Sequence, residues 1–230
     1  MLIDPQNLTL DVNHVRSRID SAAKAAGRDP AAVTLVAVSK GKTAEIMRAA
    51  ATAGVTDFGE NYLQEALGKI DQLSDLGLRW HFIGAIQSNK TRAIAERFDW
   101  VHSIDRLAVA RRLSDQRPFH APPLNLCIQV AVVAEPGKGG VDPGNLRELA
   151  ARTAELPRVR LRGLMCIPPP LPGAAAERAV FSQLRAMLDG LIAGGLPLDT
   201  LSMGMSADFE SAIAEGATHV RIGTALFGAR

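Results

Sequence analysis

Short apolar runs alternate with amphipathic segments along nearly the whole chain. The runs are rich in β-branched and aliphatic residues, which is typical of strands buried on both faces, as in a parallel sheet. The segments between them repeat their apolar residues at helical spacing, and several end at a glycine. We predict strands at 34–40, 57–60, 79–84, 100–104, 124–133, 160–167, 200–204 and 219–228. We predict helices at 10–26, 44–53, 62–73, 90–97, 106–116, 143–155, 174–193 and 208–214.

The even number of strands distinguishes two architectures. Eight strands, each but the last followed by a helical stretch, are the pattern of a closed (β/α)8 TIM barrel. The alternative, an open doubly wound sheet, would leave two sheet edges and requires no such even count. We therefore predict an α/β fold in which residues 1–230 form one barrel domain with an extra N-terminal helix.

Composition and charge exclude several classes of function. The formal net charge is only +2, so nothing indicates nucleic acid or an anionic membrane as a partner. The start of the chain lacks the pattern of a secretory signal, and no apolar run reaches membrane-spanning length. Cys127 and Cys166 lie in apolar strand-like runs, which suits buried thiols in a reducing compartment better than a disulfide or a metal site. We predict a cytoplasmic protein without a bound metal.

Lys40 is the strongest candidate for chemistry. It follows the apolar run of the first strand, at the carboxyl end, where α/β sheets and barrels place their ligand sites. Burial disfavours the ammonium form, and a neutral amine is the nucleophile that makes a Schiff base with a carbonyl. The alternative is a lysine whose apolar stem leaves the strand end and whose charge lies in water.

Closure of the barrel would bring further candidates to Lys40, because the eighth strand then lies beside the first. The ends of strands seven, eight, one and two carry SMGMS at 202–206, RIGT at 221–224, Lys40 and GEN at 59–61. Glycines and small hydroxyl residues after strands seven and eight are what a phosphate site requires. A phosphate site and a Schiff-base lysine together indicate pyridoxal 5′-phosphate (PLP) as the cofactor.

Several longer stretches resemble one family. They are AVSK at 37–40, FGENYLQEA at 58–66, WHFIGAIQSNKTR at 80–92, RGLMCIP at 162–168 and residues 201–230. With these, the chain resembles the pyridoxal phosphate homeostasis proteins (the YggS/PROSC type), which look like the barrel domain of alanine racemase without its second domain. The resemblance implies a monomeric, cytoplasmic protein that holds PLP as an aldimine on Lys40. Thr43, Ala131 and the glycine-rich loop 134–140 depart from the family pattern.

On the ring side of the cofactor the candidates are Asn61, His81 and Arg221. Asn61 either bonds the ring substituents, which the resemblance favours, or caps the following helix. His81 is a second candidate ligand, and its alternative is a packed histidine with satisfied ring nitrogens. By the resemblance, Arg221 lies against the pyridine nitrogen; alternatively it braces the phosphate or pairs with a carboxylate.

For the phosphate we predict contacts from Gly223 and Thr224, with Ser206 assisting. The alternative for Ser206 is a cap on the last full helix. Met203 is a candidate to flank the ring, although methionine is by default a core residue. Lys138 either takes the cofactor transiently or is simply exposed.

Three functions remain open at this point. The family resemblance implies a non-catalytic carrier involved in PLP homeostasis and supply. The alternative is a PLP-dependent amino-acid racemase or decarboxylase; however, alanine racemase takes a second proton-transfer group, a tyrosine, from its additional domain and partner subunit. A third hypothesis is an interaction partner of PLP-dependent apoenzymes.

Overall fold

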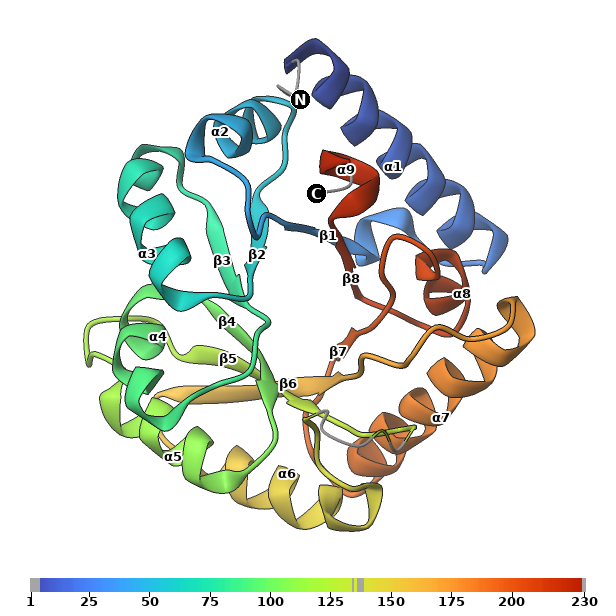
Figure 1. The fold of residues 1–230 in the computed structure, drawn as a ribbon. Coiled ribbons are helices and arrows are strands. Elements are labelled where there is room, and N and C mark those ends of the chain that lie inside the picture. Colours follow the sequence, from blue (N-terminus) through green and yellow to red (C-terminus); the bar gives the residue numbers. More distant parts are fainter. Residues whose placement is uncertain (1–4, 134, 136–138, 229–230) are drawn as a thin grey trace.

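The strands pair in chain order and close on themselves. The computed structural model describes residues 5–133, 135 and 139–228. Eight parallel strands form the sequence β1-β2-β3-β4-β5-β6-β7-β8, and β8 pairs with β1, so the predicted closed barrel is confirmed (Figure 1). The strands are β1 Thr34–Val38, β2 Asp57–Glu60, β3 Arg79–Phe82, β4 Trp100–Ile104, β5 Leu124–Gln129, β6 Val159–Met165, β7 Thr200–Ser202 and β8 His219–Ile222.

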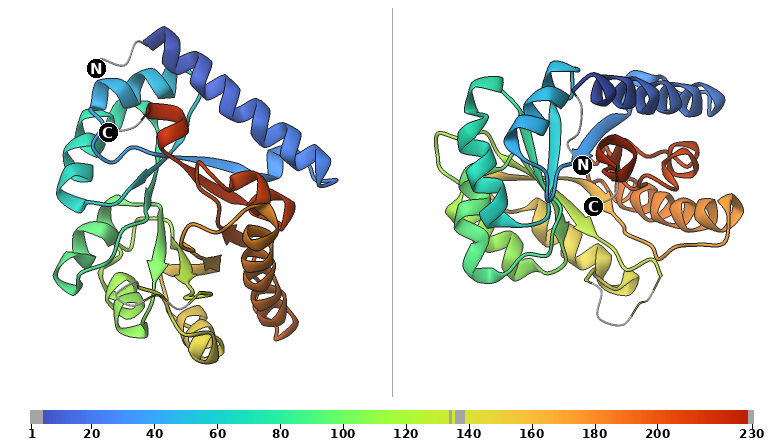
Figure 2. Two further views of the ribbon diagram at one scale, coloured as in Figure 1. Left: turned by 45° about the vertical axis from the view of Figure 1, so that its right-hand side comes forward. Right: turned by 45° about the horizontal axis from the view of Figure 1, so that its top comes forward.

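The helices surround the barrel on its outside, as the views in Figure 2 show. The α-helices are α1 Pro5–Ala25, α2 Ala44–Thr52, α3 Leu63–Gln72, α4 Thr91–Arg97, α5 Leu107–Gln116, α6 Leu146–Ala154, α7 Ala174–Ala193, α8 Phe209–Ala214 and α9 Thr224–Phe227. Four 3₁₀ helices among the described residues are η1 Pro30–Ala32, η2 Ser74–Leu76, η3 Ser88–Lys90 and η4 Pro143–Asn145.

The last predicted strand was wrong in its second half. We expected a strand over 219–228, but β8 ends at Ile222 and the short helix α9 follows. The run RIGTALFG is largely apolar, and periodicity alone does not separate a buried strand from a buried helix in so short a run. The correction affects function, because α9 begins at the predicted phosphate site.

Helix α1 is the predicted extra helix before the barrel. Its buried residues Val12, Val15, Ile19 and Ala23 recur at helical spacing on one face. The helix packs against α2, α8 and α9, so it covers the outer side where the barrel closes (Figures 1 and 2). The chain leaves it through Gly27, whose φ of 67° favours glycine.

The main core lies between the strands and the helices, and a second, smaller set of apolar side chains is separate from it. Trp100, Cys127 and Met165 form a separate small cluster. Cys127 and Cys166 are both buried and free, as predicted, and burial raises the pKa of each thiol to about 12. None of the helices in the described part of the chain is long and apolar enough to cross a membrane.

Candidate functional site

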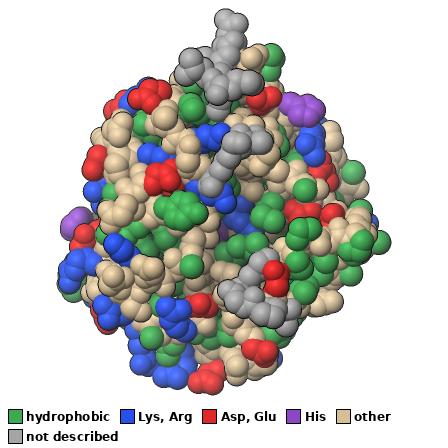
Figure 3. All heavy atoms as spheres, in the orientation of Figure 1, with side chains coloured by type: hydrophobic (Ala, Val, Ile, Leu, Met, Phe, Trp, Pro, Cys, Tyr) green, Lys and Arg blue, Asp and Glu red, His purple; other side chains and the backbone are tan. Residues whose placement is uncertain are grey.

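Barrel closure places Lys40 beside the phosphate candidates. Val36 pairs with Arg221 in β8 on one side and with Asp57 in β2 on the other. Lys40 lies two residues beyond the end of β1 and is half-buried. In Figure 3, basic side chains lie near the centre of the face that is seen along the barrel axis. The predicted adjacency of the ends of β7, β8, β1 and β2 is therefore confirmed.

The side chain of Lys40 is directed toward the barrel mouth by the alternation of the chain. Ser39 continues the ladder, because its N–H donates to Gly59 O at 3.0 Å. The hydroxyl of Ser39 is fully buried on the outer side, where it donates to Glu60 Oε1 at 2.7 Å. Successive side chains of an extended chain point to opposite faces, so Lys40 points inward. Lys42 is used elsewhere, since its Nζ donates to Phe227 O at 2.8 Å and ties α9 to the β1 end.

Asn61 does not cap the helix that follows it. Helix α3 begins at Leu63 and its cap position is Tyr62, which makes no side-chain cap hydrogen bond. Asn61 Oδ1 is buried and has no hydrogen-bond partner in the described structure. Gly84 packs directly on this loop, since a Cβ there would lie 2.1 Å from Asn61 O. The loop is fixed by close packing, and the buried Asn61 Oδ1 still lacks a partner. A buried oxygen of this kind fits an amide that binds a ligand.

The turn after β8 has the features of the predicted phosphate site. Ser206 Oγ accepts a hydrogen bond from Ala225 N, in the first turn of α9, at 3.3 Å. Ser206 therefore faces α9 and does not cap α8, whose cap position is Asp208. A Cβ on Gly223 would lie 3.3 Å from Val38 O, so the turn packs closely on the end of β1. In the first turn of α9, Leu226 N and Phe227 N donate to Gly223 O, so an anion here would meet the start of the helix at Thr224 and the hydroxyl of Ser206.

Arg221 is held inside the barrel below the mouth. It is 4% exposed, and burial lowers the pKa of its guanidinium. Nη1 donates to Ser202 Oγ at 2.7 Å, and Nη2 donates to Cys166 O at 2.8 Å. Neither partner is a carboxylate, so the alternative of an ion pair at the mouth is not what the structure has.

A chain of hydrogen bonds connects Arg221 to the opposite end of the barrel. Because a guanidinium only donates, Ser202 Oγ accepts from it and gives its own proton to His102 Nδ1 at 2.7 Å. His102 then carries its proton on Nε2 and donates to His81 Nδ1 at 2.9 Å. His81 donates from Nε2 to Asp57 Oδ1 at 3.0 Å. Since β4 and β7 are not neighbours, the bond between His102 and Ser202 crosses the barrel interior.

His81 is thus placed differently from a direct ligand. It is fully buried, it stacks on Trp100 at 5.6 Å between ring centroids, and both of its ring nitrogens have partners. The chain of hydrogen bonds ends at Asp57, which Arg79 also holds. Burial alone would raise the pKa of Asp57, but hydrogen bonds from His81 and Arg79 outweigh it and lower the pKa well below its usual value. His81 supports Arg221 from inside the barrel and does not reach the mouth.

Two histidines of the interior remain neutral at low pH. Burial, and then the neighbouring His81, lower the pKa of His102 well below its usual value. The same two causes lower the pKa of His219 to about 3. No three His, Cys, Asp or Glu side chains among the described residues are grouped so that they could hold a metal ion.

This burial predicts acid sensitivity. An unfolded histidine binds a proton below about pH 6.5, whereas His102 and His219 stay neutral in the folded protein. The contribution of these groups to the free energy of unfolding is therefore fully present above that pH and is lost as the pH falls. The two groups together lower the free energy of unfolding by about 3 kcal/mol between pH 7.5 and 5.5. Urea unfolding followed by circular dichroism at several pH values measures it. His219→Asn should remove about half of the dependence; an unchanged slope in this variant would contradict the assignment.

Met203 is not part of the mouth. Its neighbour Ser202 faces the interior, so Met203 faces the helices, where it is fully buried in the same core cluster as Phe209 and Ala212. The alternative of a core methionine is therefore what the structure shows.

Lys138 lies outside the described residues. Ala131 follows β5 in an irregular segment, where its N–H donates to Val141 O.

A cluster of buried charges behind Lys40 was missed at the level of sequence. Lys69 on α3 is 5% exposed and its Nζ lies 2.7 Å from Glu60 Oε1 and 2.5 Å from Glu65 Oε1. Glu65 and Lys69 are four residues apart, which is the spacing of an ordinary surface pair on a helix. The signal that could have revealed the cluster is Glu60, a carboxylate inside an otherwise apolar strand.

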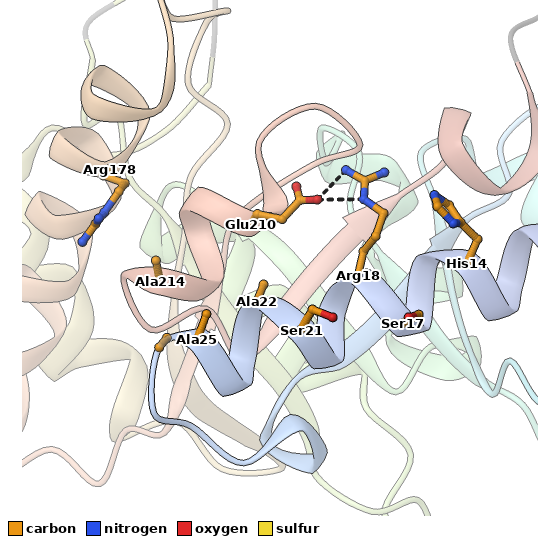
Figure 4. A pocket seen from close by; sticks show the side chains of 10 residues that line it. His14, Ser17, Arg18, Ser21, Ala22, Ala25, Arg178, Glu210 and Ala214 are labelled. Atoms are coloured by element: carbon orange, nitrogen blue, oxygen red, sulfur yellow. Dashed lines mark hydrogen bonds and ion pairs between the residues drawn. The ribbon is translucent and has the colours of Figure 1, made fainter.

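A further groove lies away from the barrel mouth. A groove of about 700 Å³ lies on the outside of the barrel between α1, α7 and α8 (Figure 4). Its charged side chains are already paired: Arg18 with Glu210, and Arg178 with Glu215. The groove is open and lined largely by small residues, so the mouth around Lys40 remains the candidate site.

The fold and the site define a class, and the comparisons agree with it. Residues 10–230 match the model of the alanine racemase N-terminal domain family, to which the chain belongs. Within this class the chain belongs to the pyridoxal phosphate homeostasis protein family. It is 61% identical over 220 residues to the family member of Pseudomonas aeruginosa, which covers 96% of this chain and 94% of that protein. It is 52% identical over 219 residues to the member of Escherichia coli, with 94% of each chain covered.

Solved structures agree with this membership. PipY of Synechococcus elongatus, with PLP bound, matches with a TM-score of 0.84 and 41% identity, covering 96% of this chain and all of that one. A protein of unknown function from Bifidobacterium adolescentis matches with a TM-score of 0.89 and 33% identity over 98% of both chains. Alanine racemase of Corynebacterium glutamicum, at 19% identity and a TM-score of 0.67, shares the fold over 95% of this chain and 62% of its own length.

Proposed function

We propose that this chain binds PLP at the barrel mouth through an imine with Lys40, and that it acts in PLP homeostasis as a monomeric, non-catalytic carrier. One observation supports the proposal: β8 pairs with β1, and the turn at Gly223 packs on Val38, two residues before Lys40. A PLP-bound relative, PipY, is 41% identical to this chain. The two cysteines of this chain, Cys127 and Cys166, are free and buried, which suits a cytoplasmic protein.

The residues around the barrel mouth offer chemical groups that suit PLP. Lys40 supplies an amine, Asn61 an unsatisfied amide oxygen, and Arg221 a fixed buried cation. The phosphate would lie at the turn of Gly223 and Thr224, with Ser206 beside it. When bound, PLP supplies an aldehyde that reacts with amines and a ring that withdraws electrons. We propose that PLP-dependent apoenzymes are its recipients.

Reduction with borohydride tests this function directly. The protein purified with PLP should show a visible absorbance band that borohydride removes, and peptide mass spectrometry should find the reduced adduct on Lys40. An adduct on another lysine, or no adduct at all, would refute the proposed site. Inorganic phosphate should compete with PLP if the turn at Gly223 holds the phosphate group.

The non-catalytic part of the proposal predicts very slow racemisation. A two-base racemase needs a second proton-transfer group on the opposite face of the substrate. The chain has one tyrosine, Tyr62, which is 57% exposed at the start of α3. Conversion of L-alanine to D-alanine should therefore stay far below about 1 s⁻¹. Chiral chromatography of the PLP-loaded protein measures it, and turnover at ordinary enzymatic rates would favour the racemase alternative.

A further inference from the structure

Lys69 lies almost completely buried directly behind the segment that carries Lys40. Its Nζ donates to Ser39 O at 2.8 Å, to Glu60 Oε1 at 2.7 Å and to Glu65 Oε1 at 2.5 Å. An ammonium group has three N–H donors, and all three have acceptors here. Lysine is almost never buried unless it is paired, so the burial of Lys69 depends on these three acceptors.

The acceptors of Lys69 hold the chain on both sides of Lys40. Before it, Ser39 contributes its carbonyl oxygen to Lys69 and donates from its hydroxyl to Glu60 Oε1 at 2.7 Å. After it, the N–H of Gly41 donates to Glu65 Oε1 at 2.5 Å. Gly41 has a φ of 72°, in the left-handed region, so the chain turns sharply at this point. The peptide groups that flank Lys40 are thus tied to one charged cluster.

We propose that Lys69 is a positioning residue for Lys40: with Glu60 and Glu65, it holds the turn from Ser39 to Gly41 so that Lys40 faces the barrel mouth. The proposal rests on the function proposed above. Glu60 is fully buried on the face of β2 opposite to the interior, and α3 lies outside the barrel. Lys69 therefore acts on the site only through the backbone of Lys40. The competing explanation is that the cluster merely fastens α3 to the barrel.

The experiment uses a variant that keeps the charge balanced. Lys69→Met alone would leave two carboxylates without their cation, so it is combined with Glu60→Gln, whose amide oxygen still accepts from the serine hydroxyl. A matched control is Arg92→Met with Glu96→Gln, which removes an exposed pair on α4. Both double variants are made with Lys40 present and with Lys40→Ala.

Two ligands separate positioning from simple fastening. PLP can form the imine, whereas pyridoxine 5′-phosphate has an alcohol in place of the aldehyde and reports the noncovalent contacts alone. With Lys40 present, the Lys69 variant should bind PLP about tenfold more weakly, and with Lys40→Ala the same change should have an effect of less than about twofold. Its affinity for pyridoxine 5′-phosphate should stay within about twofold of the parent. Equal losses in both backgrounds, or for both ligands, would overturn the proposal.

A measurement without cofactor keeps this inference separate from the proposed function. Hydrogen exchange at the Gly41 amide of the PLP-free protein should become at least about tenfold faster in the Lys69 variant and stay unchanged in the control. Unchanged exchange would overturn the positioning role. If exchange changes as expected but Lys40→Ala binds PLP as the parent does, the proposed function fails while the structural role of Lys69 stands.

Discussion

Lys40→Ala is expected to abolish the visible absorbance of the PLP-loaded protein and the borohydride-stable adduct, while the fold stays intact. The visible band depends on the imine, and alanine has no amine to form it. The loss of the covalent bond should weaken PLP retention at least tenfold, or about 1.4 kcal/mol. The fold should persist because the hydrogen bonds of Ser39 and Gly41 on either side do not involve the Lys40 side chain.

Controls separate the covalent bond from the charge. Lys40→Arg keeps a cation at the mouth but forms no imine, so it should lose the band as well. Lys24→Ala, in the last turn of α1, should keep it. Thermal unfolding by circular dichroism checks the fold of each variant. If Lys40→Ala retained an adduct of native strength, the imine would have to be assigned to another lysine, with Lys42 and Lys138 the first to map.

The architecture was accessible from sequence because the strands of a parallel barrel are short apolar runs with amphipathic helices between them. Closure then implied that the end of β1 lies beside the ends of β8 and β2, and the register of Val36 with Arg221 and Asp57 confirms it. This inference needed no side-chain detail, since adjacency follows from strand order alone.

Side-chain direction was harder to predict. Ser202 and Met203 are neighbours. If the alternation is assigned one residue out of step, a side chain of the core between strands and helices is predicted to lie inside the barrel. The polar interior also escaped notice, because Asp57, His81 and His102 are far apart in the sequence. Their common signal is a polar residue at alternate positions of an apolar strand, which would have placed them on one face of the sheet.

Arg221→Glu is expected to give the site chemistry that the native protein lacks. The hypothesis is that the guanidinium of Arg221, fixed by Ser202 and Cys166, lies against the pyridine nitrogen of PLP. A guanidinium only donates hydrogen bonds, so it would hold that nitrogen unprotonated and leave the ring a poor electron sink. A carboxylate would instead favour a protonated nitrogen, and a protonated ring withdraws electrons from the α-carbon of a bound amino acid.

The measurement is exchange of the α-hydrogen of alanine with deuterium in D₂O, followed by NMR. The Glu variant should exchange it at least about tenfold faster than the parent, which corresponds to about 1.4 kcal/mol of barrier. Because a buried carboxylate can impair folding, Arg221→Gln serves as a second variant: its amide NH2 can donate to Cys166 O and to Ser202 Oγ, as the guanidinium does. If Arg221 braces the phosphate instead, both variants should lose PLP and neither should exchange faster. Normal PLP retention without faster exchange in the folded Glu variant would show that Arg221 does not control the ring nitrogen, because a carboxylate in contact with that nitrogen must change its protonation.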